Sequence, residues 1–154
     1  MIEWLKGPLF AAVATSAFSV LFGLHSVEVF LASGGAALGW AVYQTIPPMG
    51  SAAFPAFLAA LAAGLYSEVV ARFRHRPATV YSIASIIPLV PGGGMYYTMM
   101  ASLNGDSALS VETGLATLMT AFAIAVGLAV SHAIGRMLLD STFRPYPPKG
   151  DTSK

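Results

Sequence analysis

Apolar residues follow one another along this chain in long runs, and short polar or proline-containing segments separate the runs. Each run is close to the length of about 20 residues that a helix needs to cross a bilayer. The predicted spans cover residues 8–24, 29–45, 51–70, 78–103 and 113–139. The pattern therefore predicts an all-α fold, a polytopic bundle of about five transmembrane helices. We expect one transmembrane domain, 1–139, followed by a short cytoplasmic C-terminal tail, 140–154.

The fourth run cannot form one regular helix, because a Pro-x-x-Pro-Gly-Gly-Gly segment lies in its middle. Pro88 cannot donate a hydrogen bond to the carbonyl of Ala84, nor Pro91 to that of Ile87. Gly92 to Gly94 add a segment that is free to take positive φ. Broken backbone at membrane depth is tolerated only where protein buries it or where it lines a watery cavity. Such interrupted spans indicate the substrate site of a transporter.

Composition supports the membrane assignment. Hydrophobic residues make up 56% of the 154 residues and charged residues only 10%, whereas a soluble domain carries about 25% charged residues. The net charge of +1 gives no reason to expect a nucleic-acid partner, and the absence of cysteine excludes disulfides and thiolate metal sites. No phosphate-binding loop or zinc-protease motif occurs. We therefore expect no enzyme, no metal and no cofactor.

Small residues recur at a spacing of four within several spans. Such stripes let membrane helices approach closely, because lipid offers no hydrophobic drive for their association. Alternatively, they reflect only the abundance of alanine in membrane helices. The stripes are Gly35 and Gly39; Ala52, Ala56, Ala60 and Gly64; Ala121, Ala125, Ala129 and Ala133; and Gly127, Ser131 and Gly135.

The basic residues predict the orientation. Arg72, Arg74 and Arg76 lie between the third and fourth spans, and four more basic residues lie in or after the end of the fifth. With five spans both groups fall on the same side, which is cytoplasmic by the positive-inside rule. The N-terminus is then outside and the C-terminus cytoplasmic.

The second half of the fourth span would begin a new helix at membrane depth. Its first N–H groups lack helical partners and its dipole end is positive, so it suits an anion such as a carboxylate. Tyrosine and threonine hydroxyls would add contacts, and Ser82 or Ser85 would satisfy carbonyls freed by the prolines. The alternative is a kinked structural helix whose gaps neighbouring side chains fill. The candidate substrate-binding residues are Pro88, Pro91, Gly92, Gly93, Gly94, Tyr96, Tyr97, Thr98 and Ser85.

Three ionisable residues are candidates for gating or proton coupling. Glu68 and Arg72 have the i, i+4 spacing of a helical ion pair, which is either a surface pair or a gate at the cytoplasmic mouth. His132 lies within the fifth span, where ionisable groups are costly and often functional. It is alternatively a packed or interfacial histidine.

The segment from Ala78-Thr79-Val80 through Ile86-Ile87-Pro88-Leu89-Val90-Pro91-Gly92 to Tyr96 and a Thr-Met pair resembles the threonine/serine exporter family. The chain is similar to the small membrane component of that family, which corresponds to the C-terminal half of the fused exporters. The family's Pro-x-x-Pro-Gly motif maps onto Pro88, Pro91 and Gly92, and the glycines here continue through Gly94.

This resemblance implies the small subunit of a secondary exporter in the bacterial inner membrane. Its substrate would be a small carboxylate, either threonine and serine or a dicarboxylate such as succinate, and its partner a larger membrane subunit. One alternative is a structural or regulatory subunit that stabilises a transporter and touches no substrate. A further alternative is a homo-oligomer of this chain that transports alone.

Overall fold

The computed structural model describes residues 2–48 and 50–139, and the predicted tail lies outside these residues. The described residues form helices joined by short connections. These helices are α1 (Ile2–Leu21), α2 (Ser26–Thr45), α3 (Ala53–Arg74), α4 (Ala78–Ile86), the 3₁₀ helix η1 (Ile87–Leu89), α5 (Gly92–Leu103) and α6 (Ser107–Leu139). The predicted all-α fold is confirmed.

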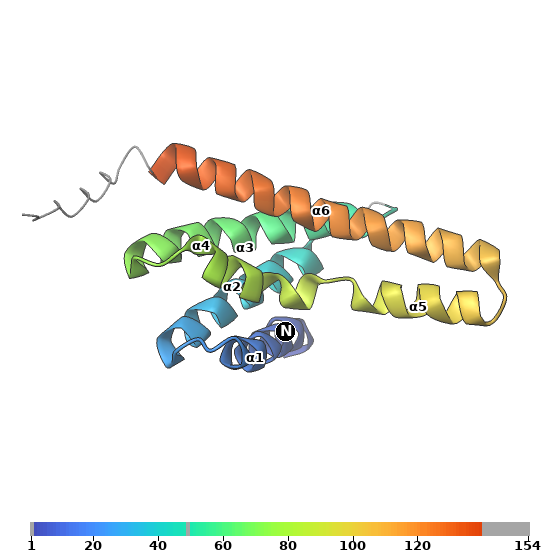
Figure 1. The fold of residues 1–154 in the computed structure, drawn as a ribbon, viewed down its shortest axis with the longest axis horizontal. Coiled ribbons are helices and arrows are strands. Elements are labelled where there is room, and N and C mark those ends of the chain that lie inside the picture. Colours follow the sequence, from blue (N-terminus) through green and yellow to red (C-terminus); the bar gives the residue numbers. More distant parts are fainter. Residues whose placement is uncertain (1, 49, 140–154) are drawn as a thin grey trace, which may run out of the picture.

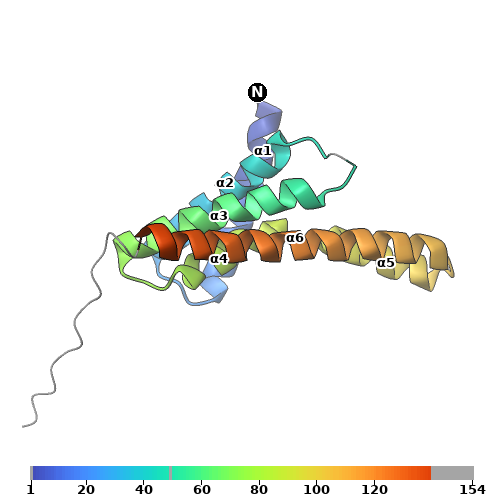
Figure 2. The same ribbon diagram turned by 90° about the horizontal axis from the view of Figure 1, so that it is seen from above.

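The helices pack as a bundle from which one hairpin projects (Figures 1 and 2). α2 packs between α1 and α3, α4 packs against both α2 and α3, and α6 lies along α3. α5 packs mainly on the first half of α6, beyond the end of the bundle. With 33 residues, α6 is about 50 Å long at 1.5 Å per residue, which exceeds the hydrocarbon thickness of about 30 Å.

Four of the described helices, α1, α2, α3 and α6, are long and apolar enough to cross a membrane. The segments Ala78–Leu89 and Gly92–Leu103 add a fifth span when they are counted together, although they are bent by 47° at the break between them. This geometry confirms a polytopic bundle of about five spans with an interrupted fourth.

Backbone groups themselves satisfy the carbonyls that the prolines would leave free. The N–H of Ile87 donates to the carbonyl of Ala84, and the N–H of Val90 donates to that of Ile87 at 3.2 Å. Each bond comes from the residue before a proline, so the chain tightens into a 3₁₀ turn. The expectation that Ser85 serves these carbonyls is wrong, since its hydroxyl donates to Ala32 on α2 at 3.0 Å.

Several helix boundaries differ from the sequence prediction. α6 begins six residues before residue 113, because Asp106 accepts a hydrogen bond from the N–H of Leu109 at 3.0 Å and so caps the helix. Glu112 therefore lies in the second turn of α6. α2 begins at Ser26, so Glu28 belongs to its first turn and not to a connecting loop.

One small-residue stripe of α6 is packed and the other is exposed. A Cβ added at Gly127 would lie 2.6 Å from the carbonyl oxygen of Phe57, and one at Gly64 would lie 2.0 Å from the hydroxyl of Ser131. The stripe formed by Gly127, Ser131 and Gly135 therefore sets the close approach of α6 to α3. The stripe of Ala121, Ala125, Ala129 and Ala133 faces away from the bundle and is exposed.

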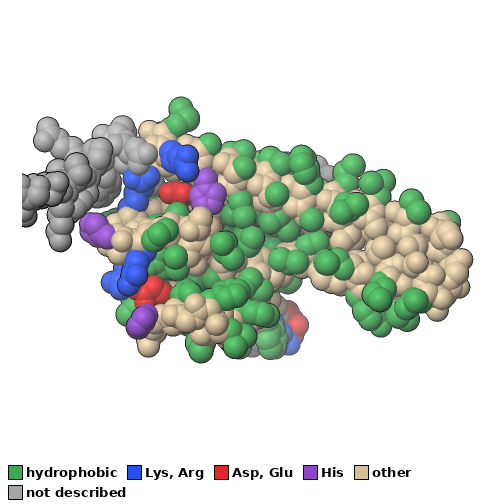
Figure 3. Space-filling model, viewed as in Figure 1, with side chains coloured by type: hydrophobic (Ala, Val, Ile, Leu, Met, Phe, Trp, Pro, Cys, Tyr) green, Lys and Arg blue, Asp and Glu red, His purple; other side chains and the backbone are tan. Residues whose placement is uncertain are grey.

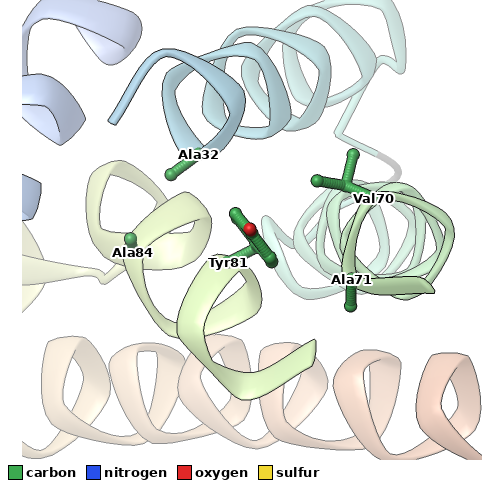
Figure 4. Packing of buried hydrophobic residues seen from close by; sticks show 5 residues of the cluster. All are labelled: Ala32, Val70, Ala71, Tyr81 and Ala84. Carbon is green, nitrogen blue, oxygen red and sulfur yellow. The ribbon is translucent and has the colours of Figure 1, made fainter. Parts of the chain in front are cut away.

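A fully buried tyrosine fills the space that alanines leave among three helices (Figure 4). Tyr81 of α4 packs with Ala32 of α2 and with Val70 and Ala71 of α3. This contact anchors the first half of the broken span to the bundle. The break that follows is thus held against α2 and α3.

Charged side chains gather at one end of the molecule, where α3 and α6 end and α2 and α4 begin (Figure 3). Arg74 of α3 pairs there with the buried Glu28 of α2 at 3.4 Å. A smaller pair, Glu3 with Lys6, lies at the start of α1. The basic residues between the third and fourth spans therefore share one end with the C-terminal end of α6.

Glycine-to-alanine substitutions test the α3–α6 contact. We expect Gly127→Ala to lower the free energy of unfolding by about 1–3 kcal/mol, because its Cβ would meet the Phe57 backbone, which cannot rotate away. Gly92→Ala is the matched control, since its Cβ would meet no atom within 4 Å. Thermal unfolding in mild detergent measures both. Equal melting temperatures for the two variants would contradict the assigned packing.

Candidate functional site

A cavity of about 400 Å³ lies at the break of the fourth span. α2 contributes two aromatic residues to its wall, the segment from η1 to the start of α5 forms another side, and α6 supplies three threonines. Its lining residues are Trp40, Tyr43, Ala52, Pro88, Leu89, Val90, Pro91, Gly92, Gly93, Gly94, Tyr97, Thr113, Ala116, Thr117 and Thr120. The broken backbone thus lines a hollow formed by three parts of the chain.

Most of the predicted substrate-binding residues lie on this cavity. Pro88, Pro91, Gly92 to Gly94 and Tyr97 line it. Three others do not: Tyr96 is 60% exposed on α5, Thr98 faces α6 and lines a neighbouring hollow, and Ser85 is buried against α2. The structure therefore places one predicted hydroxyl, that of Tyr97, at the cavity beside the break. The hydroxyls of Tyr96, Thr98 and Ser85 lie elsewhere.

Two backbone donors at the start of α5 have no acceptor among the described residues. The N–H of Gly92 donates to the carbonyl of Val90, and that of Met95 donates to Pro91. The N–H groups of Gly93 and Gly94 make no such bond. Because these donors lie at the positive end of the α5 dipole and their residues line the cavity, the wall suits an anionic group.

The three glycines matter for space and not for backbone conformation. None of them has positive φ, because α5 already begins at Gly92. A Cβ at Gly92 or Gly93 would meet no atom within 4 Å, whereas one at Gly94 would lie 2.3 Å from the Thr117 hydroxyl. Gly92 and Gly93 therefore keep the cavity wall open, and Gly94 lets α5 approach α6.

Sequence reasoning missed the opposite walls of the cavity. Thr113, Thr117 and Thr120 follow one another at spacings of four and three on α6, which places them on one helix face. That polar stripe in an apolar span was a signal that could have found them. Trp40 and Tyr43 of α2 carried no comparable signal, because aromatic residues are common near the ends of spans.

Glu68, Arg72 and His132 come together where α3 and α6 meet at the charged end. The carboxylate of Glu68 lies 2.7 Å from Nδ1 of His132 and 4.0 Å from the Arg72 guanidinium. Arg72 also donates to the carbonyl of Gly135 at 3.1 Å. A Cβ at Gly135 would lie 2.6 Å from the Glu68 side chain, so this glycine makes room for the carboxylate. None of the three ionisable residues lines the cavity at the break.

Taken together, the fold and the cavity define a helical membrane protein with a hollow at a broken span. The chain belongs to the threonine/serine exporter family, because the sequence model described as "Threonine/Serine exporter, ThrE" matches residues 8–134. It is 30% identical over 135 residues to a protein of Corynebacterium glutamicum named "Threonine/serine exporter". That match covers 87% of this chain but only 28% of the relative. No solved structure matches the chain.

Removing the buried carboxylate tests the α3–α6 cluster. We expect Glu68→Gln to lower the free energy of unfolding by roughly 3 kcal/mol, because Arg72 and His132 lose their common partner in a mostly buried position. Glu3→Gln removes an exposed pair and should change stability by about 0–1 kcal/mol. Thermal unfolding in mild detergent compares the two variants. If both melt like the unchanged protein, the cluster does not hold α3 to α6.

Proposed function

We propose that this chain is the small subunit of a secondary-active exporter of small carboxylate metabolites. The observation that carries the proposal is the cavity at the break, with the unpaired N–H groups of Gly93 and Gly94 in its wall. Backbone donors at a helix start bind a carboxylate without a fixed cationic side chain. Membership of an exporter family supports the same conclusion.

Threonine and serine are the first substrates to test, because the relative from Corynebacterium glutamicum bears their names. A dicarboxylate such as succinate is the second. Both classes carry a carboxylate that fits the start of α5. A cavity of about 400 Å³ is large enough for any of these molecules.

The proposed partner is a larger membrane subunit of the same family. This chain spans about a quarter of its relative, 28%, and in our proposal the larger subunit supplies the rest of the exporter. The hairpin of α5 and α6 exposes large apolar side chains, including Tyr96, Met99 and Leu103 of α5. This exposure also favours the alternative function, a structural subunit that binds its partner through the hairpin and touches no substrate. A homo-oligomer of this chain is the third arrangement.

We assign energy coupling to the cluster of Glu68, Arg72 and His132. Carboxylate and imidazole groups within membrane spans form the proton relays of pumps and transporters. This pair, 2.7 Å apart, joins α3 to α6, and α6 supplies one wall of the cavity. Proton binding there would alter the α3–α6 contact and so gate the path from the cytoplasmic end. Export would then draw on the proton gradient or the membrane potential.

Filling the cavity tests substrate binding directly. We expect Gly93→Leu to reduce threonine efflux at least about tenfold, because the new side chain occupies a lining position with open space around it. The control is Ala125→Leu, which adds the same side chain to the exposed stripe of α6. Efflux is measured from loaded cells that lack their own exporters and express both subunits. Normal efflux by Gly93→Leu, with the subunits still co-purifying, would favour the structural alternative.

Two serine-to-cysteine variants test the proposed inner-membrane orientation, since the chain has no cysteine of its own. Ser26 is exposed at the start of α2 and Ser107 is exposed at the start of α6. We expect an impermeant thiol reagent to label Ser107→Cys from outside intact cells and Ser26→Cys only after permeabilisation. The reverse pattern would place the N-terminus in the cytoplasm.

A further inference from the structure

The backbone that precedes the break, in η1, has carbonyl groups that accept no hydrogen bond from the described residues. The carbonyl of Pro88 has no donor in the following turn, because Pro91 lacks an N–H and the Gly92 N–H donates to Val90. The carbonyl of Leu89 has none either, because the N–H of Gly93 makes no such bond. Both residues line the cavity. Unpaired carbonyls at the end of a half-helix are a site for a cation, as unpaired N–H groups are for an anion.

The α6 threonines across the cavity also present lone pairs. Thr117 donates its hydroxyl proton to the carbonyl of Thr113 at 2.7 Å, and Thr120 donates to that of Ala116 at 2.9 Å. A hydroxyl has one proton and two acceptor positions, so each oxygen can still accept, and both residues line the cavity. Thr117 lies beside Gly94, and Thr120 lies one turn before Ile124, which belongs to the same buried cluster as Leu89. Both threonines are therefore opposite the break.

Charge in the cavity has to be balanced by the groups that bind there, because its lining side chains carry none. No Asp, Glu, Lys, Arg or His is among the residues that line the cavity. A ligand with net charge at membrane depth would meet no compensating side chain there, at a cost of several kcal/mol. An anionic group at the start of α5 is therefore favoured when a cationic group binds beside it.

We infer that the carbonyls of Pro88 and Leu89, with the hydroxyls of Thr117 and Thr120, form a subsite for a small monovalent cationic group beside the carboxylate position. This inference rests on the proposed function. The cationic group is either the ammonium of an amino-acid substrate or a free alkali-metal ion. A zwitterion places its carboxylate at the N–H groups of α5 and its ammonium at these carbonyls, with no net charge. A dicarboxylate occupies only the position at the N–H groups.

Ligand binding to the full-length chain tests this subsite, with Trp40 of the cavity wall as the fluorescent reporter. Trp4→Phe removes the other tryptophan of the chain. The ligands are threonine and 3-hydroxybutyrate, which is threonine without its amino group, each titrated in sodium chloride and in choline chloride. We expect 3-hydroxybutyrate in choline chloride to bind at least about tenfold more weakly than threonine, because it brings no cationic group.

The salt comparison distinguishes the two sources of the cation. Weak 3-hydroxybutyrate binding in both salts assigns the subsite to the substrate's ammonium. Binding that sodium restores assigns it to an alkali-metal ion. Equal binding of both ligands in choline chloride overturns the subsite and leaves the carboxylate site standing. Absence of binding by either ligand to folded protein overturns the subsite together with the proposed substrate site.

Threonine-to-valine variants locate the subsite. Thr117→Val and Thr120→Val keep the shape of the side chain and remove the oxygen, so each should weaken threonine binding several-fold and leave 3-hydroxybutyrate binding in choline chloride unchanged. The matched control is Thr45→Val on α2, whose exposed hydroxyl donates to its own helix in the same way. An unchanged affinity for threonine in both α6 variants would contradict the assignment of these oxygens.

Discussion

The need to satisfy backbone hydrogen bonds within a bilayer governs this structure. A span with two prolines loses two helical bonds, and the chain recovers the affected carbonyls through a 3₁₀ turn at Ile87–Leu89. The same turn leaves other groups unpaired on either side of the break, at Pro88 and Leu89 and at Gly93 and Gly94. Because lipid cannot satisfy such groups, they have to face protein, water or a ligand. The cavity formed with α2 and α6 meets that need.

Helix packing holds the segments on both sides of the break in place. Tyr81 fixes the segment before it against α2 and α3, while α5 after it rests on α6. α6 in turn is held to α3 by close glycine contacts and by the Glu68–His132 pair. A change in the α3–α6 contact would therefore move the cavity wall that carries the threonines. This continuity is the physical basis for linking an ionisable cluster at one end to a cavity at the break.

The sequence predicted those features of the fold that depend on neighbouring residues alone. Proline and glycine act on their own backbone, so the break at Pro88 and Pro91 could be located without a structure, and the apolar runs were enough for the number of spans. Contacts between helices could not be predicted from the sequence in the same way. Glu68 and His132 are 64 residues apart, and only the packing of α6 on α3 brings them together. Likewise, the two alanine and glycine stripes of α6 look equivalent in sequence, yet one is buried and the other exposed.

The most direct test of the account is the reactivity of a cysteine placed in the break. Gly93→Cys introduces the only thiol of the chain at a cavity-lining position with open space around it. The account predicts that a small hydrophilic thiol reagent modifies this cysteine in membranes that contain the assembled exporter, and that threonine slows the modification. A cysteine at this position that remains unreactive, or that reacts at the same rate with and without every carboxylate tested, would contradict a substrate cavity at the broken span.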